Sequence, residues 1–144
     1  MKTLFIACGN PLRGDDGVAP EVLRLMKPAS GRKLRTVHQL TPELAEEMSR
    51  FDCVVFLDAD VAASSVTIAP VSAIPPSPSL AHISSFTHNS KPAEIVALSR
   101  ALFGFIGAAL LCRIPAIHFD PGAALSPRAL KFVQQAAEEI EDFL

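Results

Sequence analysis

Two adjacent carboxylates, Asp15 and Asp16, follow a glycine-rich loop near the beginning of the sequence, where they could attract a cation. The loop starts at Gly9, directly after an apolar run, and Gly14 completes the Gly-x-x-x-x-Gly spacing of a phosphate-binding loop. A phosphate-binding loop continues with Lys and then Ser or Thr, whereas two carboxylates at these positions would repel a phosphate. The sequence therefore predicts that a metal ion or a positively charged group binds at this corner.

The two carboxylates receive different interpretations. An Asp at a helix N-terminus accepts hydrogen bonds from free N–H groups and complements the helix dipole, and one Asp is enough for this purpose. We assign that capping role to Asp15, at the start of the helix that follows the loop. Asp16 is then the functional candidate, either as a metal ligand or as a catalytic group.

Asp58 and His88 complete a candidate metal site with Asp16. Asp58 directly follows the apolar run 53–57, and a carboxylate buried there without a partner would be costly, so we expect it to serve a site. His88 lies in a polar loop ahead of a proline-led helix. Two carboxylates and one imidazole suit a borderline divalent ion such as nickel or zinc and leave coordination positions open. Asp60 is expected either in a turn or next to the metal ligands, without binding the metal itself.

Other reactive side chains are weaker candidates. His118, two residues before Asp120, predicts either a structural His–Asp contact or the rim of a cleft. The three cysteines have no CxxC spacing and are expected to be small buried thiols: Cys8, Cys53 and Cys112. Nucleophilic catalysis by serine is poorly supported because the chain has no Gly-x-Ser-x-Gly motif, and the HExxH helix of zinc proteases is also missing from the sequence.

The composition predicts one folded domain covering residues 1–144, with 49% apolar and 19% charged residues. The formal net charge of −2 gives no reason to expect nucleic acid or an anionic membrane surface as a partner. No apolar run approaches the roughly 20 residues of a membrane span, and the apolar run before Gly9 is too short for a signal peptide. We expect a cytoplasmic protein.

Strand-like and helix-like segments alternate along the chain, which predicts an α/β fold: a single three-layer α/β/α domain with a mostly parallel five-stranded sheet. The expected strands are 3–8, 33–38, 53–57, 65–71 and 108–114, and the expected helices are 18–26, 41–49, 92–103 and one opened by Ser126 and Pro127. Segment 65–71 follows its predecessor without a helix, so we expect an antiparallel edge strand. Ligand sites of such sheets lie outside the carboxyl ends of the strands, so Asp16 and Asp58 should share one cleft.

The motifs, in this order, resemble those of the hydrogenase maturation protease family. The loop Gly9–Gly17 matches the family's Gly-Asn-x-Leu-x-x-Asp-Asp/Glu-Gly motif, and a strand ending at Asp58-Ala59 follows it. Thr87-His88 matches a loop before a helix, and Ile114-Pro115 and Leu125-Ser126-Pro127 match the end of the family pattern. The resemblance covers essentially the whole chain, and its first motif is the specific one.

This resemblance implies an endopeptidase that removes a C-terminal extension from the precursor of a nickel–iron hydrogenase large subunit after nickel insertion. The family's three metal-binding positions correspond to Asp16, Asp58 and His88. The nickel would be supplied by the substrate precursor, and no tightly bound cofactor of the enzyme's own is implied. Asp16 could alternatively act as general base in an aspartic-type mechanism.

The chain departs from the family pattern at two places. The usual Gly-x-Gly-Asn is here Ala7-Cys8-Gly9-Asn10, and the Asp-Gly-Gly-Thr segment of many members is replaced by residues 38–44. Gln39 and Glu43 in that segment are therefore candidates for precursor recognition, or ordinary surface residues around a helix start. Two alternatives remain: a non-catalytic, chaperone-like module that holds the precursor, and a phosphate-binding protein, against which Asp15 and Asp16 argue.

Overall fold

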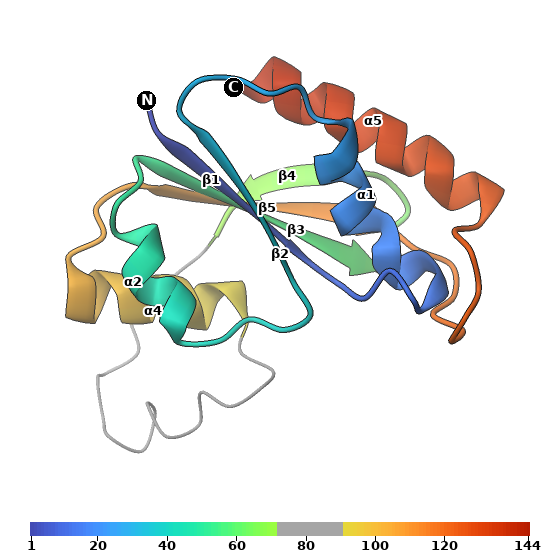
Figure 1. The fold of residues 1–144 in the computed structure, drawn as a ribbon, viewed down its shortest axis with the longest axis horizontal. Helices are drawn as coiled ribbons and strands as arrows, with labels where there is room; N and C mark the ends of the chain where they lie inside the picture. Colours follow the sequence, from blue (N-terminus) through green and yellow to red (C-terminus); the bar gives the residue numbers. More distant parts are fainter. Residues whose placement is uncertain (72–90) are drawn as a thin grey trace.

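The structure, a computed structural model, describes residues 1–71 and 91–144. Five strands form one mixed sheet in the order β2-β1-β3-β5-β4 (Figure 1). Their bounds are β1 Thr3–Cys8, β2 Arg32–Val37, β3 Cys53–Asp60, β4 Thr67–Pro70 and β5 Ala108–Pro115. Four strands run parallel, and β4 pairs antiparallel with β5 at one edge, which confirms the predicted edge strand.

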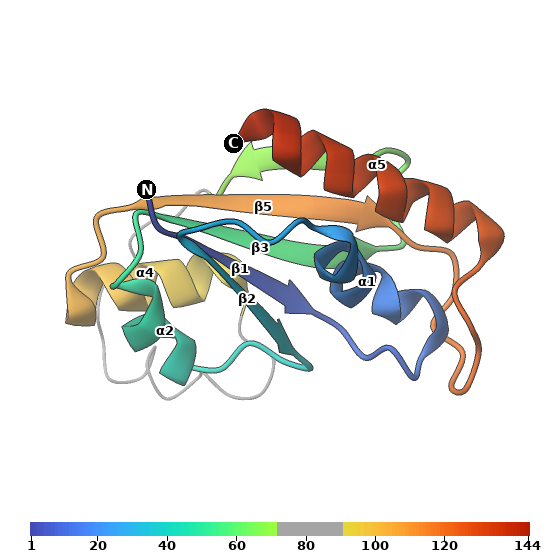
Figure 2. The ribbon, with the colours of Figure 1, turned by 45° about the horizontal axis from the view of Figure 1, so that its top comes forward.

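Helices cover both faces of this sheet, as predicted. The helix α1 (Val18–Leu25) and the long α5 (Pro127–Phe143) lie on one face, and α2 (Glu43–Met48) and α4 (Pro92–Phe103) lie on the other (Figure 2). A short 3-10 helix, η1 (Gly14–Gly17), leads into α1. The described part of the chain therefore forms three layers, α/β/α.

The central strands are buried because both of their faces are covered, which is why they read as continuous apolar runs. In β1, Phe5 and Ala7 pack in the core beneath α1 and α5, whereas Leu4 and Ile6 pack in the core beneath α2 and α4. All four side chains are fully buried. Alternation along one strand thus holds both helical layers on the same sheet.

The strand β3 is longer than its apolar run predicts. It continues through Asp58 and ends at Asp60, because these residues pair in register with Arg113 and Pro115 of β5. Asp58 therefore lies near the end of a paired strand rather than after it. Its backbone is fixed by the neighbouring strand, which makes it a rigid support for a functional side chain.

Helix ends follow the predictions in part. Ser126 caps α5, with its Oγ accepting a hydrogen bond from the N–H of Ala129 at 3.1 Å, and Gly104 ends α4 in the left-handed conformation (φ 71°). The expected helix 41–49 is shorter in the structure: α2 begins at Glu43, and no side chain caps it. Proline already fixes the entry of the chain there, and Thr41 contributes its carbonyl oxygen to the N–H of Leu44 instead.

Two leucines of the helices α1 and α5 stay partly exposed. Leu25 near the end of α1 and Leu130 in α5 keep 40% and 43% exposure, while Leu23 and Ala136 are buried in the core. Helix α1 and helix α5 pack against each other as well as against the sheet, and the residues that they bury between them and the sheet include Leu23 of α1 and Ala136 of α5.

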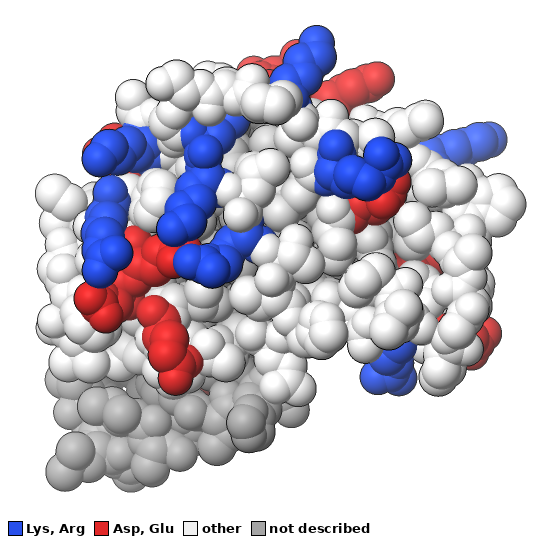
Figure 3. Space-filling view, in the orientation of Figure 1, with Lys and Arg blue, Asp and Glu red and all other residues white. Residues whose placement is uncertain are grey.

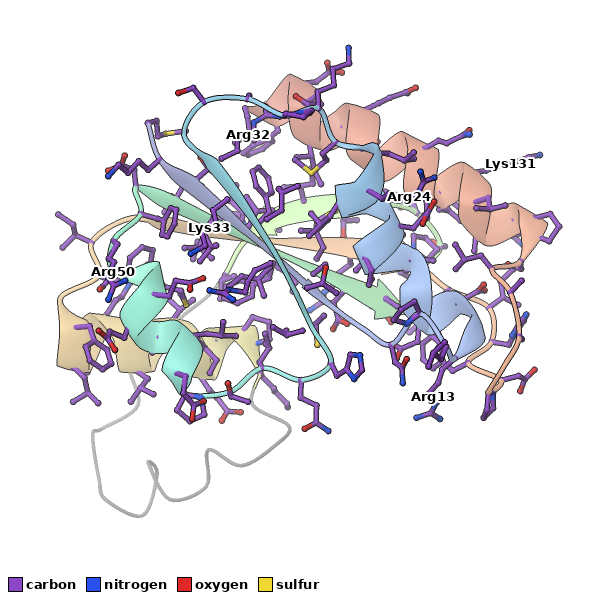
Figure 4. All side chains as sticks on the ribbon, viewed as in Figure 1. Arg13, Arg24, Arg32, Lys33, Arg50 and Lys131 are labelled. Carbon is purple, nitrogen blue, oxygen red and sulfur yellow. The ribbon has the colours of Figure 1, made fainter. Side chains whose placement is uncertain are left out.

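Charged side chains on the β2 side of the molecule are paired with one another. Arg32 forms two hydrogen bonds of 2.8 Å with Glu141 of α5, and Arg35 binds Glu47 of α2 through two nitrogens. Lys33 lies 3.6 Å from the same Glu47. Figure 3 shows the basic and acidic groups interleaved on this face, and Figure 4 labels Arg32 and Lys33 on the strand. Among the described residues, no helix is both long and apolar enough to cross a membrane.

Candidate functional site at the carboxyl edge of the sheet

The candidate site lies where the parallel strands β1 and β3 end. Cys8, the last residue of β1, is the register partner of Asp58 in β3. The chain leaves β1 through residues 9–13, and the segment 116–126 that follows β5 runs beside this loop at the same end of the sheet (Figures 1 and 2). The edge is therefore built from β1, β3 and two loops that contact each other.

Gly9 and Asn10 fix the position of Asp16. A Cβ atom at Gly9 would lie 2.0 Å from the backbone oxygen of Asp16, so no other residue fits without moving the loop. The N–H of Asn10 donates to Oδ2 of Asp16 at 2.8 Å, and Oδ1 of Asn10 accepts from the N–H of Leu12 at 3.0 Å. The loop thus folds back on itself and holds the half-buried Asp16 carboxylate at its base.

The folded protein disfavours the ionised form of Asp58. Asp58 is exposed to solvent rather than enclosed, but partial burial of its carboxyl raises the pKa to about 6 from an ordinary value of 3.8, and the negative charges of Asp16 and Asp60 raise it in the same direction. The N–H of Ala59 and the charge of Arg113 act against this rise. Asp16 is therefore close enough to Asp58 for the two charges to repel, and a bound cation would relieve that repulsion.

Cys8 belongs to this site, although its sequence context indicated only a small buried thiol. Burial, followed by the charges of Asp58 and Asp16, raises the pKa of Cys8 to about 11, so its thiol stays protonated at neutral pH. Its Sγ donates to the carbonyl oxygen of His38 at 3.6 Å. The signal that could have placed it was positional: a residue that ends the first strand faces the end of the strand beside it.

Asp15 does not cap its own helix, so that prediction is wrong. The side chain is fully buried, and η1 has no side-chain cap. Its carboxylate instead accepts hydrogen bonds from the chain segment 117–126, including the N–H and hydroxyl groups of Ser126 at the N-terminus of α5. Burial alone would raise the pKa of Asp15, but the N–H groups of Ser126 and Ile117 hold that pKa below its ordinary value.

Asp60 and His118 serve the loops around the site. Oδ1 of Asp60 accepts from the N–H of Ala62 at 2.8 Å, which confirms the predicted turn. Nδ1 of His118 lies 3.5 Å from Oδ2 of Asp120, which confirms the predicted His–Asp contact. The same imidazole packs over η1, where a Cβ at Gly14 would come within 2.9 Å of Nδ1.

Of the expected metal ligands, Asp16 and Asp58 come together, and His88 lies outside the described residues. Within residues 1–71 and 91–144, no group of three or more His, Cys, Asp and Glu side chains is arranged to hold a metal ion. Gln39 and Glu43 are both exposed, after β2 and at the start of α2. Their role in recognition stays a prediction.

Comparison with known proteins gives matches at the level of structure. No family model and no curated protein matches the chain. The hydrogenase maturating endopeptidase HybD from E. coli is similar, with a TM-score of 0.71 and 17% identity over 97% of this chain and 90% of that one. The [NiFe] hydrogenase maturation protease HycI from Thermococcus kodakarensis KOD1 has a TM-score of 0.71 and 18% identity, covering 98% and 90% of the two chains. The [NiFe] hydrogenase maturation protease HybD from Thermococcus kodakarensis has a TM-score of 0.70 and 21% identity over 99% of both chains. The chain therefore has the fold of the [NiFe] hydrogenase maturation proteases.

Proposed function

We propose that this protein is an endopeptidase that removes the C-terminal extension of a [NiFe] hydrogenase large-subunit precursor once nickel has been inserted. The nickel is part of the substrate. Asp16, Asp58 and His88 would bind the precursor through this metal, so that a precursor lacking nickel is a poor substrate. Cleavage would then report that the metal centre is in place.

One observation carries the proposal: Asp16 and Asp58 lie at the same carboxyl edge of a sheet whose fold is that of hydrogenase maturation proteases, where burial and then the charge of Asp16 raise the pKa of Asp58. A pair of like charges held by strand pairing and by the loop Gly9–Asn10 is unfavourable unless a cation or a proton joins it. Carboxylate oxygens are ordinary ligands for divalent ions of this kind.

The residues have separate tasks in this proposal. Asp58 stands on a paired strand and supplies a rigid oxygen ligand after losing its proton. Asp16 presents a carboxylate whose Oδ2 is oriented by Asn10, either as a second ligand or as general base toward a water at the scissile bond. Holding the metal at a fixed position would also fix the scissile bond of the precursor beside these groups.

The surroundings of the site also suit a protein substrate. Leu12, Val61 and Ile117 stand on three loops at this edge of the sheet, with exposures of 72%, 60% and 51%. Exposed large apolar side chains near a site are typical of surfaces that bind another protein. They provide a second type of contact beside the metal.

The test is to incubate nickel-loaded precursor with the protein and its variants and to measure the precursor's mass. Asp16→Asn, Asp58→Asn and His88→Ala should each abolish shortening of the precursor while the variants stay folded. Asp142→Asn removes one carboxylate from an exposed position near the end of α5, away from the site, and is the matched control that should process normally. Normal processing by Asp16→Asn or Asp58→Asn would refute the site. Binding of the precursor without any loss of mass would favour the non-catalytic holding module.

A further inference from the structure

We propose that Asp15 is a positioning residue for Asp16: its buried carboxylate locks η1 onto the segment 117–126 and thereby sets the orientation of the Asp16 carboxylate. This inference rests on the proposed function, in which Asp16 meets the precursor. Asp15 itself lies beneath the surface, with no exposed area, so it touches no substrate. Its influence must pass through the backbone that it shares with Asp16.

Four hydrogen bonds converge on the Asp15 carboxylate. Oδ1 accepts from the N–H of Ser126 at 2.8 Å. Oδ2 accepts from the N–H of Ile117 at 2.7 Å, from the N–H of His118 at 3.4 Å and from the hydroxyl of Ser126 at 3.0 Å. These donors are 102 to 111 residues away in the sequence, so the carboxylate joins two distant loops.

Backbone hydrogen bonds continue the same connection on both sides. The N–H of Asp15 donates to the carbonyl oxygen of His118 at 2.8 Å, and the N–H of Gly14 donates to that of Ala123 at 3.1 Å. The N–H of Gly122 donates to the carbonyl oxygen of Leu12 at 2.7 Å. The loop that carries Asp16 is therefore fixed from outside by residues 117–126, with Asp15 as the side chain at the centre of the contact.

The site requires a carboxylate because every partner is a donor. A carboxylate offers acceptors on both oxygens, whereas an amide replaces one oxygen with an NH₂ donor. In Asp15→Asn, either orientation of the amide directs that NH₂ at an N–H group, that of Ser126 or that of Ile117. The clash and the lost bonds should loosen η1, and with it the direction of the neighbouring Asp16.

Ser126→Ala provides a matched control. It removes the hydroxyl that caps α5 and one of the four bonds to Asp15, but it keeps the N–H bonds that hold η1 in place. Both variants should therefore unfold more easily than the wild type. Only Asp15→Asn should disturb Asp16, so the pair separates loss of stability from loss of positioning.

The experiment has two readouts at a temperature where circular dichroism shows both variants folded. The first is kcat/KM for shortening of nickel-loaded precursor, which should fall about tenfold or more in Asp15→Asn and stay within about twofold in Ser126→Ala. The second is amide hydrogen exchange at Asn10, whose N–H binds Asp16. After subtraction of the change in global stability, this exchange should rise about tenfold in Asp15→Asn alone.

The outcomes separate this inference from the proposed function. If the wild type shortens no precursor, the proposed function fails, and exchange at Asn10 still decides whether Asp15 positions the loop. Equal exchange in Asp15→Asn and Ser126→Ala, or wild-type kcat/KM in Asp15→Asn, overturns the inference. If Asp15→Asn folds only with trimethylamine N-oxide, which favours compact states without restoring a lost contact, its kcat/KM should remain low in the osmolyte. Recovery of kcat/KM there would show that Asp15 serves stability alone.

Discussion

Replacing Asp58 with Asn should stabilise the protein while it abolishes processing. The folded protein disfavours the ionised Asp58 carboxyl, because burial and the charge of Asp16 raise its pKa from 3.8 to about 6. A difference of this size corresponds to about 3 kcal/mol for a fully buried group. Asp58 is an exposed residue, so solvent screening reduces the expected gain to about 1 kcal/mol. Asn retains an oxygen that can accept the N–H of Ala59 and carries no charge.

The sign of the effect fixes its pH dependence. Above pH 6, Asp58 is ionised in the folded and the unfolded chain, so its unfavourable charge lowers the free energy of unfolding of the wild type by the full amount. As the pH falls from about 6 toward 3.8, the folded protein takes up a proton before the unfolded chain does, and this loss of stability disappears. The advantage of Asp58→Asn should therefore be largest near pH 8 and should shrink below pH 6.

Urea unfolding at pH 8 and pH 5 measures this difference directly. Asp142→Asn is the control for removal of a single exposed charge and should change the free energy of unfolding by less than about 0.5 kcal/mol at either pH. An Asp58→Asn variant that is less stable than the wild type at pH 8 would refute the electrostatic account. The same would follow from an advantage that is equal at pH 8 and pH 5.

Three further predictions follow from the same structure. Processing should lose about tenfold in rate for each pH unit below 6, because the proposed function requires Asp58 to lose its proton before it can bind the metal. A flat profile of rate against pH from 5 to 7 would contradict this. Gly9→Ala should cost about 2 kcal/mol or more and abolish processing, because its Cβ would come within 2.0 Å of a backbone oxygen. Gly104→Ala is the control, because Gly104 has a positive φ of 71° but open space around it, and the change should cost about 1 kcal/mol and leave processing intact. Equal effects of the two changes on urea unfolding and processing would contradict the close-approach argument. The buried Oγ of Ser99 donates to the carbonyl oxygen of Ala45 at 2.6 Å and so joins α4 to α2. Ser99→Ala should therefore lower the urea midpoint by the equivalent of about 1 kcal/mol with an unchanged slope. An unchanged midpoint would show that this contact contributes nothing to stability.

The strands were predictable because the sequence pattern that marks each of them is local. Apolar runs mark β1, β3 and β5, and a segment that follows a strand without a helix between them must turn back, as β4 does. The convergence of Asp16 and Asp58 was predictable for a related reason, since parallel strands end at one edge. What the apolar run could not indicate is that pairing with Arg113 extends β3 beyond Leu57.

The role of Asp15 could not be predicted from its neighbours in the sequence. An Asp ahead of a helix fits a cap locally, and that interpretation is wrong because the donors nearest to its carboxylate come from Ile117 and Ser126. A hydrogen bond between residues more than 100 positions apart leaves no local pattern. Cys8 was underestimated for the same reason, because its surroundings depend on Asp58 in another strand.

The most direct test of the central claim is the mass of the precursor after incubation with the wild-type protein, with and without nickel in the precursor. We expect a single shorter product from the nickel-loaded precursor, and no shortening of the nickel-free precursor under the same conditions. An unchanged mass in both samples would contradict the endopeptidase function. Equal shortening of both would contradict recognition of the metal by Asp16 and Asp58.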